Sequence, residues 1–492
     1  MSSRSASPSR LPAGFALLLA GCPPPIATED TGDAPTGSSS TTSPGDSASD
    51  TGATPTSRPD PTSTGTVPDT ASTTGTTGTT LGVDTTTGDT TTSQTTSTGD
   101  ASTSSTSSTT GPVEPPPGCD VAVVHVGELV ITDDTAMADL QCIVEVTGRL
   151  TINGTQTLVS FAALANLERV GDDIQVFDNL ALEDLDGFAA LERVDGEMYG
   201  ELVVHHNPAL TDLTGLKSLK QVDTVLISDC DALTDLTGLT GTLEGVFGVP
   251  SLAISDCDGL TNLDGLTGLT DLTGSIFIHG NTQLTDIDAL STVLSPTIEQ
   301  ISIDGNSALQ DLQGLDLVVA SKSVLVTNND ILVDLTGLDS LQKVGPGFLF
   351  IEGNAQLVSL DGLGALDTVT DLSIEDNPAL TSLAGLASLT HVTGGMTLGR
   401  CGEQGNDGLV DLHGLENLVE MQYISLNEND ALQSIAALPA DIGIGGIIAF
   451  NNPQLSNAAI ADYVADAGIG QKSHLCNNGG APAVCECIVL TD

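Results

Sequence analysis

Nine cysteines and seven histidines are the residues of this chain with the widest chemical capacity, because both types ligate metals and serve as nucleophiles or proton carriers. Their spacing does not favour metal binding, since no Cys-x-x-Cys pair occurs and no paired histidines accompany one. The chain also shows no phosphate-binding glycine loop, no nucleophile elbow and no Ser, His and Asp set that can be registered. We therefore expect no catalytic residues, no cofactor and no metal.

Cys22 differs from the other cysteines in its surroundings. Arg4 and Arg10 accompany an apolar run of about ten residues, too short to cross a bilayer, which ends at Leu19-Ala20-Gly21-Cys22. This segment resembles the lipobox of bacterial lipoproteins. The resemblance implies that residues 1–22 are a lipoprotein signal peptide and that Cys22 is acylated and becomes the mature N-terminus. The alternative is an ordinary signal peptide that contains a cysteine.

Residues 23–118 form a linker rich in Ser, Thr, Pro and Gly. With almost no large apolar side chains, this stretch cannot offset its ordering entropy, and we expect it to be disordered. As a flexible coil it would span roughly 50–60 Å. No other stretch of 18 apolar residues occurs, so the lipid would be the only membrane attachment, at the bacterial outer membrane or cell surface.

The acidity of the chain limits its partners. Its 65 acidic and 12 basic residues give a formal net charge of -53. Phosphate binding needs clusters of Lys and Arg, so we expect no nucleic-acid partner and no binding to anionic lipid surfaces.

A short repeat returns every 25 residues or so from about residue 150 onward, as in LFIEGNAQLVSLDGL at Leu349–Leu363. Apolar residues stand five and three positions before a polar marker, which predicts a β-strand with one buried face. Glycine in the following Leu-x-Gly-Leu segment, as at Gly215, Gly362 and Gly385, is expected to permit a sharp corner. The markers are Thr155, Asn179, Asn207, Cys230, Cys257, Asn281, Asn306, Asn329, Asn354, Asn377, Cys401, Asn429 and Asn452.

The repeat Leu-x-Ile-x-x-Asn-x-x-Leu-x-x-Leu-x-Gly-Leu resembles the receptor L-domain, a leucine-rich-repeat-like solenoid. The resemblance implies a mainly β, right-handed parallel β-solenoid of about 13–14 rungs over residues 119–470, followed by a Cys-containing C-terminal cap at residues 471–492. It leaves open whether the rungs form one stack or two lobes. It also implies that a disulfide between Cys119 and Cys142 closes the N-terminal end.

Three further cysteines fall on the marker. Adjacent rungs should place Cys230 and Cys257 about 5 Å apart, so they form either a disulfide or two buried thiols. The rung after Cys401 is long, which predicts a loop at Gly402–Asp407 directly after the marker. In the C-terminal cap we expect one bridge to Cys476.

Charged and polar residues gather near the markers. The acidic stretches Ser228–Asp231 and Ser255–Asp258 could ligate calcium, but they lack an EF-hand pattern, and we expect them to be solvated acidic corners. His205 and His279 occupy equivalent positions three rungs apart, too far for shared ligation, and are expected to be exposed polar residues at strand ends.

Residues four positions before the marker should point out of the sheet. Those in the middle of the chain are apolar, and the row becomes polar after Phe350. Exposed apolar patches mark interaction sites, and insulin-receptor-type L-domains bind ligands on a sheet face. We therefore predict a non-catalytic binding or adhesion protein with a protein or glycan ligand; the alternatives are a structural envelope spacer and a carbohydrate-active β-helix enzyme. The candidate ligand face comprises Val203, Leu226, Phe277, Leu325 and Phe350.

Overall fold

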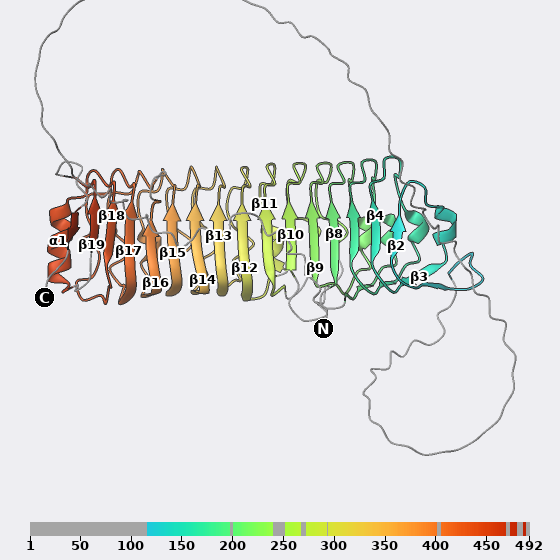
Figure 1. Cartoon of the computed structure of the whole chain (residues 1–492), viewed down its shortest axis with the longest axis horizontal. Coiled ribbons are helices and arrows are strands. Elements are labelled where there is room, and N and C mark those ends of the chain that lie inside the picture. The colour runs from blue at the N-terminus through green and yellow to red at the C-terminus, as the bar shows by residue number, and fades with distance from the viewer. Residues whose placement is uncertain are drawn as a thin grey trace, which may run out of the picture. The chain divides into compact units, whose positions relative to one another are not determined.

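The computed structural model describes residues 116–196, 200–239, 251–266, 272–292, 294–400, 405–468, 473–479 and 486–488 (Figure 1). Cys22, the signal peptide and residues 23–115 of the linker lie outside the described residues. Almost all of the described residues belong to the repeat region and its C-terminal cap.

One sheet of 16 strands runs through the repeats, and every neighbouring pair in it is parallel except the last (Figure 1). Parallel strands need a crossover between them, and here each repeat supplies one strand and its own return path. The strands, in sheet order, are β2 (Leu129–Ile131), β4 (Leu150–Asn153), β6 (Ile174–Phe177), β8 (Glu201–His205), β9 (Thr224–Ser228), β10 (Ser251–Ser255), β11 (Ser275–His279), β12 (Thr297–Asp304), β13 (Ala320–Thr327), β14 (Lys343–Glu352), β15 (Thr368–Glu375), β16 (His391–Leu398), β17 (Glu420–Asn427), β18 (Ile447–Phe450), β19 (Ser473–Cys476) and β20 (Glu486–Ile488).

The return paths contain a smaller sheet and short helices. The second sheet has four strands: β1 (Val123–His125), β3 (Ile143–Val146), β5 (Arg169–Val170) and β7 (Arg193–Val194). The 3-10 helices are η1 (Met137–Leu140), η2 (Ala162–Leu164), η3 (Asp186–Phe188), η4 (Thr214–Leu216), η6 (Asp288–Thr292) and η7 (Ala384–Leu386). The helix α1 (Asn457–Asp466) lies near the C-terminal end of the stack (Figure 1).

The apolar residues that alternate along each predicted strand are the residues that form the core. Leu202 and Val204 of β8 are both 0% exposed, whereas Val203 between them is half-buried. The same pattern recurs along the sheet, so the apolar pairs of successive rungs stack into one continuous core. The predicted β-solenoid is confirmed, with about 14 turns in a single unbroken sheet rather than two lobes.

The glycines of the Leu-x-Gly-Leu segment serve a purpose other than the one expected. Gly362 does have a positive φ of 108°, but Gly215 and Gly385 lie in 3-10 helices and do not. At all three positions a Cβ atom would lie within 2.1 Å of a carbonyl oxygen of the preceding rung. Glycine is therefore needed mainly because stacked rungs approach each other closely there.

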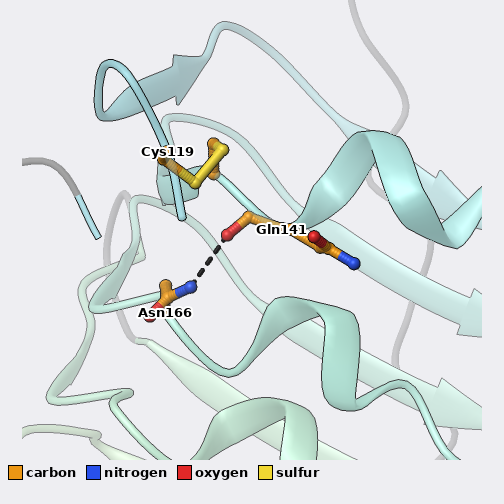
Figure 2. The surroundings of a disulfide bond; sticks show 4 residues. Cys119, Gln141 and Asn166 are labelled. Atoms are coloured by element: carbon orange, nitrogen blue, oxygen red, sulfur yellow. Dashed lines mark hydrogen bonds between the residues drawn. A yellow bond between two sulfur atoms is a disulfide. The ribbon is translucent and has the colours of Figure 1, made fainter. Parts of the chain in front are cut away.

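Both ends of the stack carry cysteine bridges. The predicted disulfide between Cys119 and Cys142 is confirmed, with a Cα–Cα distance of 5.7 Å (Figure 2). Next to it, Asn166 of the following rung donates a hydrogen bond of 2.8 Å to the carbonyl of Gln141 (Figure 2). Cys476 is also disulfide-bonded, as expected. The parallel stack extends beyond residue 470, because β19 pairs in parallel with β18.

Candidate binding face

A ladder of buried side chains sits where the strands of the main sheet end, and it holds the rungs in register. Where the marker is asparagine, its side-chain oxygen accepts the backbone N–H of the preceding marker, as from Asn329 to Asn354 at 3.0 Å. The amide Nδ2 of Asn354 donates in turn to the carbonyl of Val326 at 2.9 Å. Asn354 is 0% exposed, which confirms the predicted role of the marker.

The marker predicted for one rung is wrong. The ladder passes from Asn377 to Asn406 and then to Asn429, so Asn406 and not Cys401 occupies the position. The extra residues of this long rung therefore precede the marker rather than follow it. The ladder also continues into the C-terminal cap, where Asn478 accepts the N–H of Asn452 at 3.1 Å.

Cys230 and Cys257 are two free, buried thiols, and the disulfide considered for them is absent. Each thiol donates to a carbonyl two residues earlier, at 3.3 Å from Cys230 and 3.4 Å from Cys257. The neighbouring Cys230 thiol, together with burial, raises the pKa of Cys257. Sulfur thus replaces the asparagine amide in two rungs without interrupting the ladder, since the N–H of Cys257 still donates to Asn281.

The acidic residues beside the markers are explained by backbone conformation. The residue directly before a marker has a positive φ in rung after rung, for example 52° at Asp229 and 53° at Asp256. Gly, Asn and Asp tolerate this left-handed region best, which accounts for their recurrence there. Among the described residues no group of three or more His, Cys, Asp and Glu is placed to hold a metal ion.

The outer face of the main sheet carries the candidate ligand residues in one row. Register pairs join Val203 to Leu226, and further along Leu325 to Phe350. Phe277 lies between them, paired with Ala253 on one side and Ser302 on the other. The strand register therefore places the five residues in one row, as predicted.

Their exposure is lower than expected, and at one position the expectation was wrong. Val203, Leu226, Phe277 and Leu325 are half-buried, but Phe350 is only 9% exposed and counts as buried. Two large side chains lie beside Phe350 on the same face. Leu325 is its register partner on β13, and Phe348 stands two residues earlier on β14. Large neighbours on a pleated face shield one another, so an outward side chain is not automatically accessible.

A surface pocket of about 370 Å³ lies beside the middle of this row. Three of its lining residues, Ser275, Gln300 and Ser323, stand two positions before the row on the same strands, so they share its face. The side-chain nitrogen of Gln300 is buried and, within the described part of the chain, has no hydrogen-bond partner. The strand parity that predicted the row would also have found Gln300 and Ser323, which sequence reasoning missed. The pocket is lined by Ser275, Glu299, Gln300, Lys322, Ser323, Pro346 and Gly347.

On the other side of the row, polar side chains bond to one another across strands. His205 accepts or donates at 2.8 Å to the hydroxyl of Ser228, and His279 is 2.9 Å from the hydroxyl of Ser302. Burial lowers the pKa of His279, although Asp304 and Asp256 oppose that effect. The two histidines contact different partners and share no ligand site, as the sequence predicted. His205 is exposed as expected, whereas His279 is half-buried.

This polar side continues past Phe350. Arg400 pairs with Glu352 at 3.2 Å and with Glu375 at 3.9 Å. Ser373 donates a hydrogen bond to Glu375, which is only 7% exposed. The charges of this part of the face are therefore engaged within the molecule, and its apolar middle is bounded by bonded polar groups.

None of the described helices is long and apolar enough to cross a membrane.

Comparison with known proteins found one family match and similar solved structures. The family model described as "Receptor L domain" matches residues 124–240. An internalin from Listeria monocytogenes has a related structure, with 15% identity, a TM-score of 0.37, and coverage of 71% of this chain and 90% of that one. This likeness is too loose to carry over any property. No curated protein matches the chain.

The fold and the family match define a receptor L-domain-like solenoid of the leucine-rich-repeat type. Solenoids of this kind are typically non-catalytic binding folds, because stacked repeats present an extended surface instead of an enclosed pocket. A match of this kind over residues 124–240 is typical of protein-binding or adhesion repeat proteins.

Proposed function

We propose that this chain is a lipid-anchored, non-catalytic binding protein of the bacterial cell envelope. Acylation at Cys22 would hold it at the outer membrane or cell surface, and residues 23–118 would act as a flexible tether. The solenoid would then meet a protein or glycan ligand with the outer face of its main sheet.

The buried side-chain nitrogen of Gln300 has no hydrogen-bond partner among the described residues, and it supports this choice of face. Gln300 lies on β12, between the strands that carry Phe277 and Leu325. A buried donor without a partner costs about 1–3 kcal/mol. If the Gln300 side chain turned toward the pocket, a ligand oxygen could accept this hydrogen bond and recover the cost. The half-buried apolar side chains alongside would add contact area, which is the usual composition of a recognition site.

A binding array tests the proposal. The purified chain is applied to protein and glycan arrays, and captured ligands are retested with single variants. Leu325→Ser should weaken binding at least tenfold with little change in melting temperature. Val333→Ser is the matched control, because Val333 is an exposed apolar residue, 45% exposed, that lies outside the main sheet.

The array also separates the alternatives. A structural spacer should bind nothing, so an array without ligands would favour that function. Turnover of any member of a polysaccharide panel by the purified chain would contradict the non-catalytic proposal. Equal loss of binding in the Val333→Ser control would show that the ligand site lies elsewhere.

The anchor is tested separately. Mass spectrometry of the membrane fraction should find an acylated peptide that begins at Cys22, and Cys22→Ala should release the protein. Recovery of the wild-type protein in soluble, unmodified form would contradict the proposed anchor and leave the binding face untouched.

A further inference from the structure

A second pocket lies on the sheet face near the C-terminal end of the stack, three rungs beyond Phe350. Its volume is about 490 Å³, within the range of small-ligand sites. None of the residues that line it is Lys, Arg, Asp or Glu, although the chain as a whole carries a formal net charge of -53. The lining residues are Gln422, Tyr423, Gly443, Gly445, Gly446, Ile448 and His474.

Tyr423 is held in place by a neighbouring glycine. A Cβ atom at Gly395, its register partner on β16, would lie 2.0 Å from the Cζ atom of the Tyr423 ring. The ring therefore leans over Gly395 and covers the bare backbone there. It nevertheless stays 36% exposed, in a chain whose aromatic content is only 2%. The result is an ordered aromatic surface at the edge of the pocket.

The space beside Tyr423 exists because the next strand begins without side chains. Gly445 and Gly446 precede β18, and Gly445 donates to the carbonyl of Gln422 at 2.7 Å. His474, on β19, closes the far side and is exposed. Strands β17 and β19 are two spacings apart, about 10 Å, so a ring of sugar size fits between Tyr423 and His474.

The polar groups around this space suit hydroxyl groups. The side-chain nitrogen of Gln422 donates to the carbonyl of Thr393 at 2.7 Å, which leaves its oxygen as an acceptor. Burial and the charge of Asp371 raise the pKa of Tyr423, so its phenol is a donor at neutral pH. A neutral ligand with many hydroxyls can use both, whereas an anionic ligand would be repelled by the acidic chain.

We infer that this pocket, which we call the Tyr423 pocket, binds an uncharged pyranose unit of a glycan, stacked on the Tyr423 ring. This site is independent of the central face around Phe277 and Leu325, since the two use different strands. Failure of the function proposed for that face would leave this inference intact, and failure of this inference would leave that proposal intact.

The test uses a panel of neutral trisaccharides (cellotriose, mannotriose and N,N′,N″-triacetylchitotriose), with a trigalacturonate and a chitosan trimer as charged comparators. Binding to the full chain is followed by saturation-transfer NMR and calorimetry. At least one neutral trisaccharide should bind, and Tyr423→Ala should weaken it at least tenfold. Tyr423→Phe keeps the ring over Gly395 and should lose much less.

A second variant guards against a folding defect in Tyr423→Ala. A Cβ at Gly443 would meet nothing within 4 Å, so Gly443→Leu fills the pocket without disturbing the fold. It should abolish trisaccharide binding with an unchanged melting temperature. No binding of any neutral trisaccharide, a preference for a charged one, or binding that survives both Tyr423→Ala and Gly443→Leu would overturn the inference.

Discussion

Replacing Asn354 by leucine should damage the solenoid well beyond one rung. The side chain is 0% exposed and joins three rungs. Asn354→Leu would remove the acceptor of the Asn329 N–H, at 3.0 Å, and the donor to the carbonyl of Val326, at 2.9 Å. At about 1–3 kcal/mol for each buried group left unpaired, the variant should lose about 2–6 kcal/mol of stability.

Asn354→Cys is the natural control, because cysteine occupies the same ladder position at Cys230 and Cys257. There each thiol donates to a backbone carbonyl. We therefore expect Asn354→Cys to lose clearly less stability than Asn354→Leu, although the two side chains differ little in polarity on most scales.

Urea denaturation and native-state hydrogen exchange measure these effects. In Asn354→Leu the amide of Asn329 should lose protection, and adjacent rungs should open with it, because each repeat is stabilised by its neighbours. If the Asn329 amide keeps its protection and the denaturation midpoint is unchanged, the ladder does not stabilise the stack.

Two further variants test other features of the fold. Gly362→Ala should cost about 2–5 kcal/mol, because its Cβ would lie 1.9 Å from the carbonyl oxygen of Leu335 and φ is 108°, whereas Gly364→Ala, with nothing within 4 Å, should stay within about 0.5 kcal/mol in the same urea titration. The pKa of His279 is lower in the folded chain than in the unfolded chain, so the unfolded chain binds the His279 proton more tightly. The neutral His279 side chain therefore contributes stability above about pH 6.5, and this contribution is lost as the pH falls through the pKa of the folded state. Melting temperatures measured from pH 7.5 to pH 5 should therefore fall less steeply in His279→Gln than in the wild type, and an identical slope would contradict this assignment.

The sequence predicted the parts of this fold that depend on local spacing. Alternation around the marker identified Leu202 and Val204 as core residues and Asn354 as a buried ladder residue, because strand parity and the repeat period fix both. In the long rung the repeat period predicted Cys401 as the marker, and only the hydrogen bonds with the adjacent rungs identify Asn406 instead.

The parts that failed depend on side chains a full rung away. The exposure of Phe350 is set by neighbours such as Leu325, 25 residues earlier, and strand parity alone gives only its direction. The Tyr423 pocket likewise depends on Gly395 on β16 and on Gly446 just before β18, which the repeat pattern does not bring together without a strand register.

The antiparallel pairing of β20 with β19 has a consequence for assembly. A parallel stack is in principle open-ended, because its terminal strand offers unpaired backbone groups on which another copy could continue the sheet. A head-to-tail contact of that kind does not close, and it generates fibres. By reversing direction in its last described strand, this chain presents an edge on which the first rung of another copy, in the same orientation, would have to pair antiparallel. The reversed strand therefore interrupts the parallel ladder at this end of the described stack.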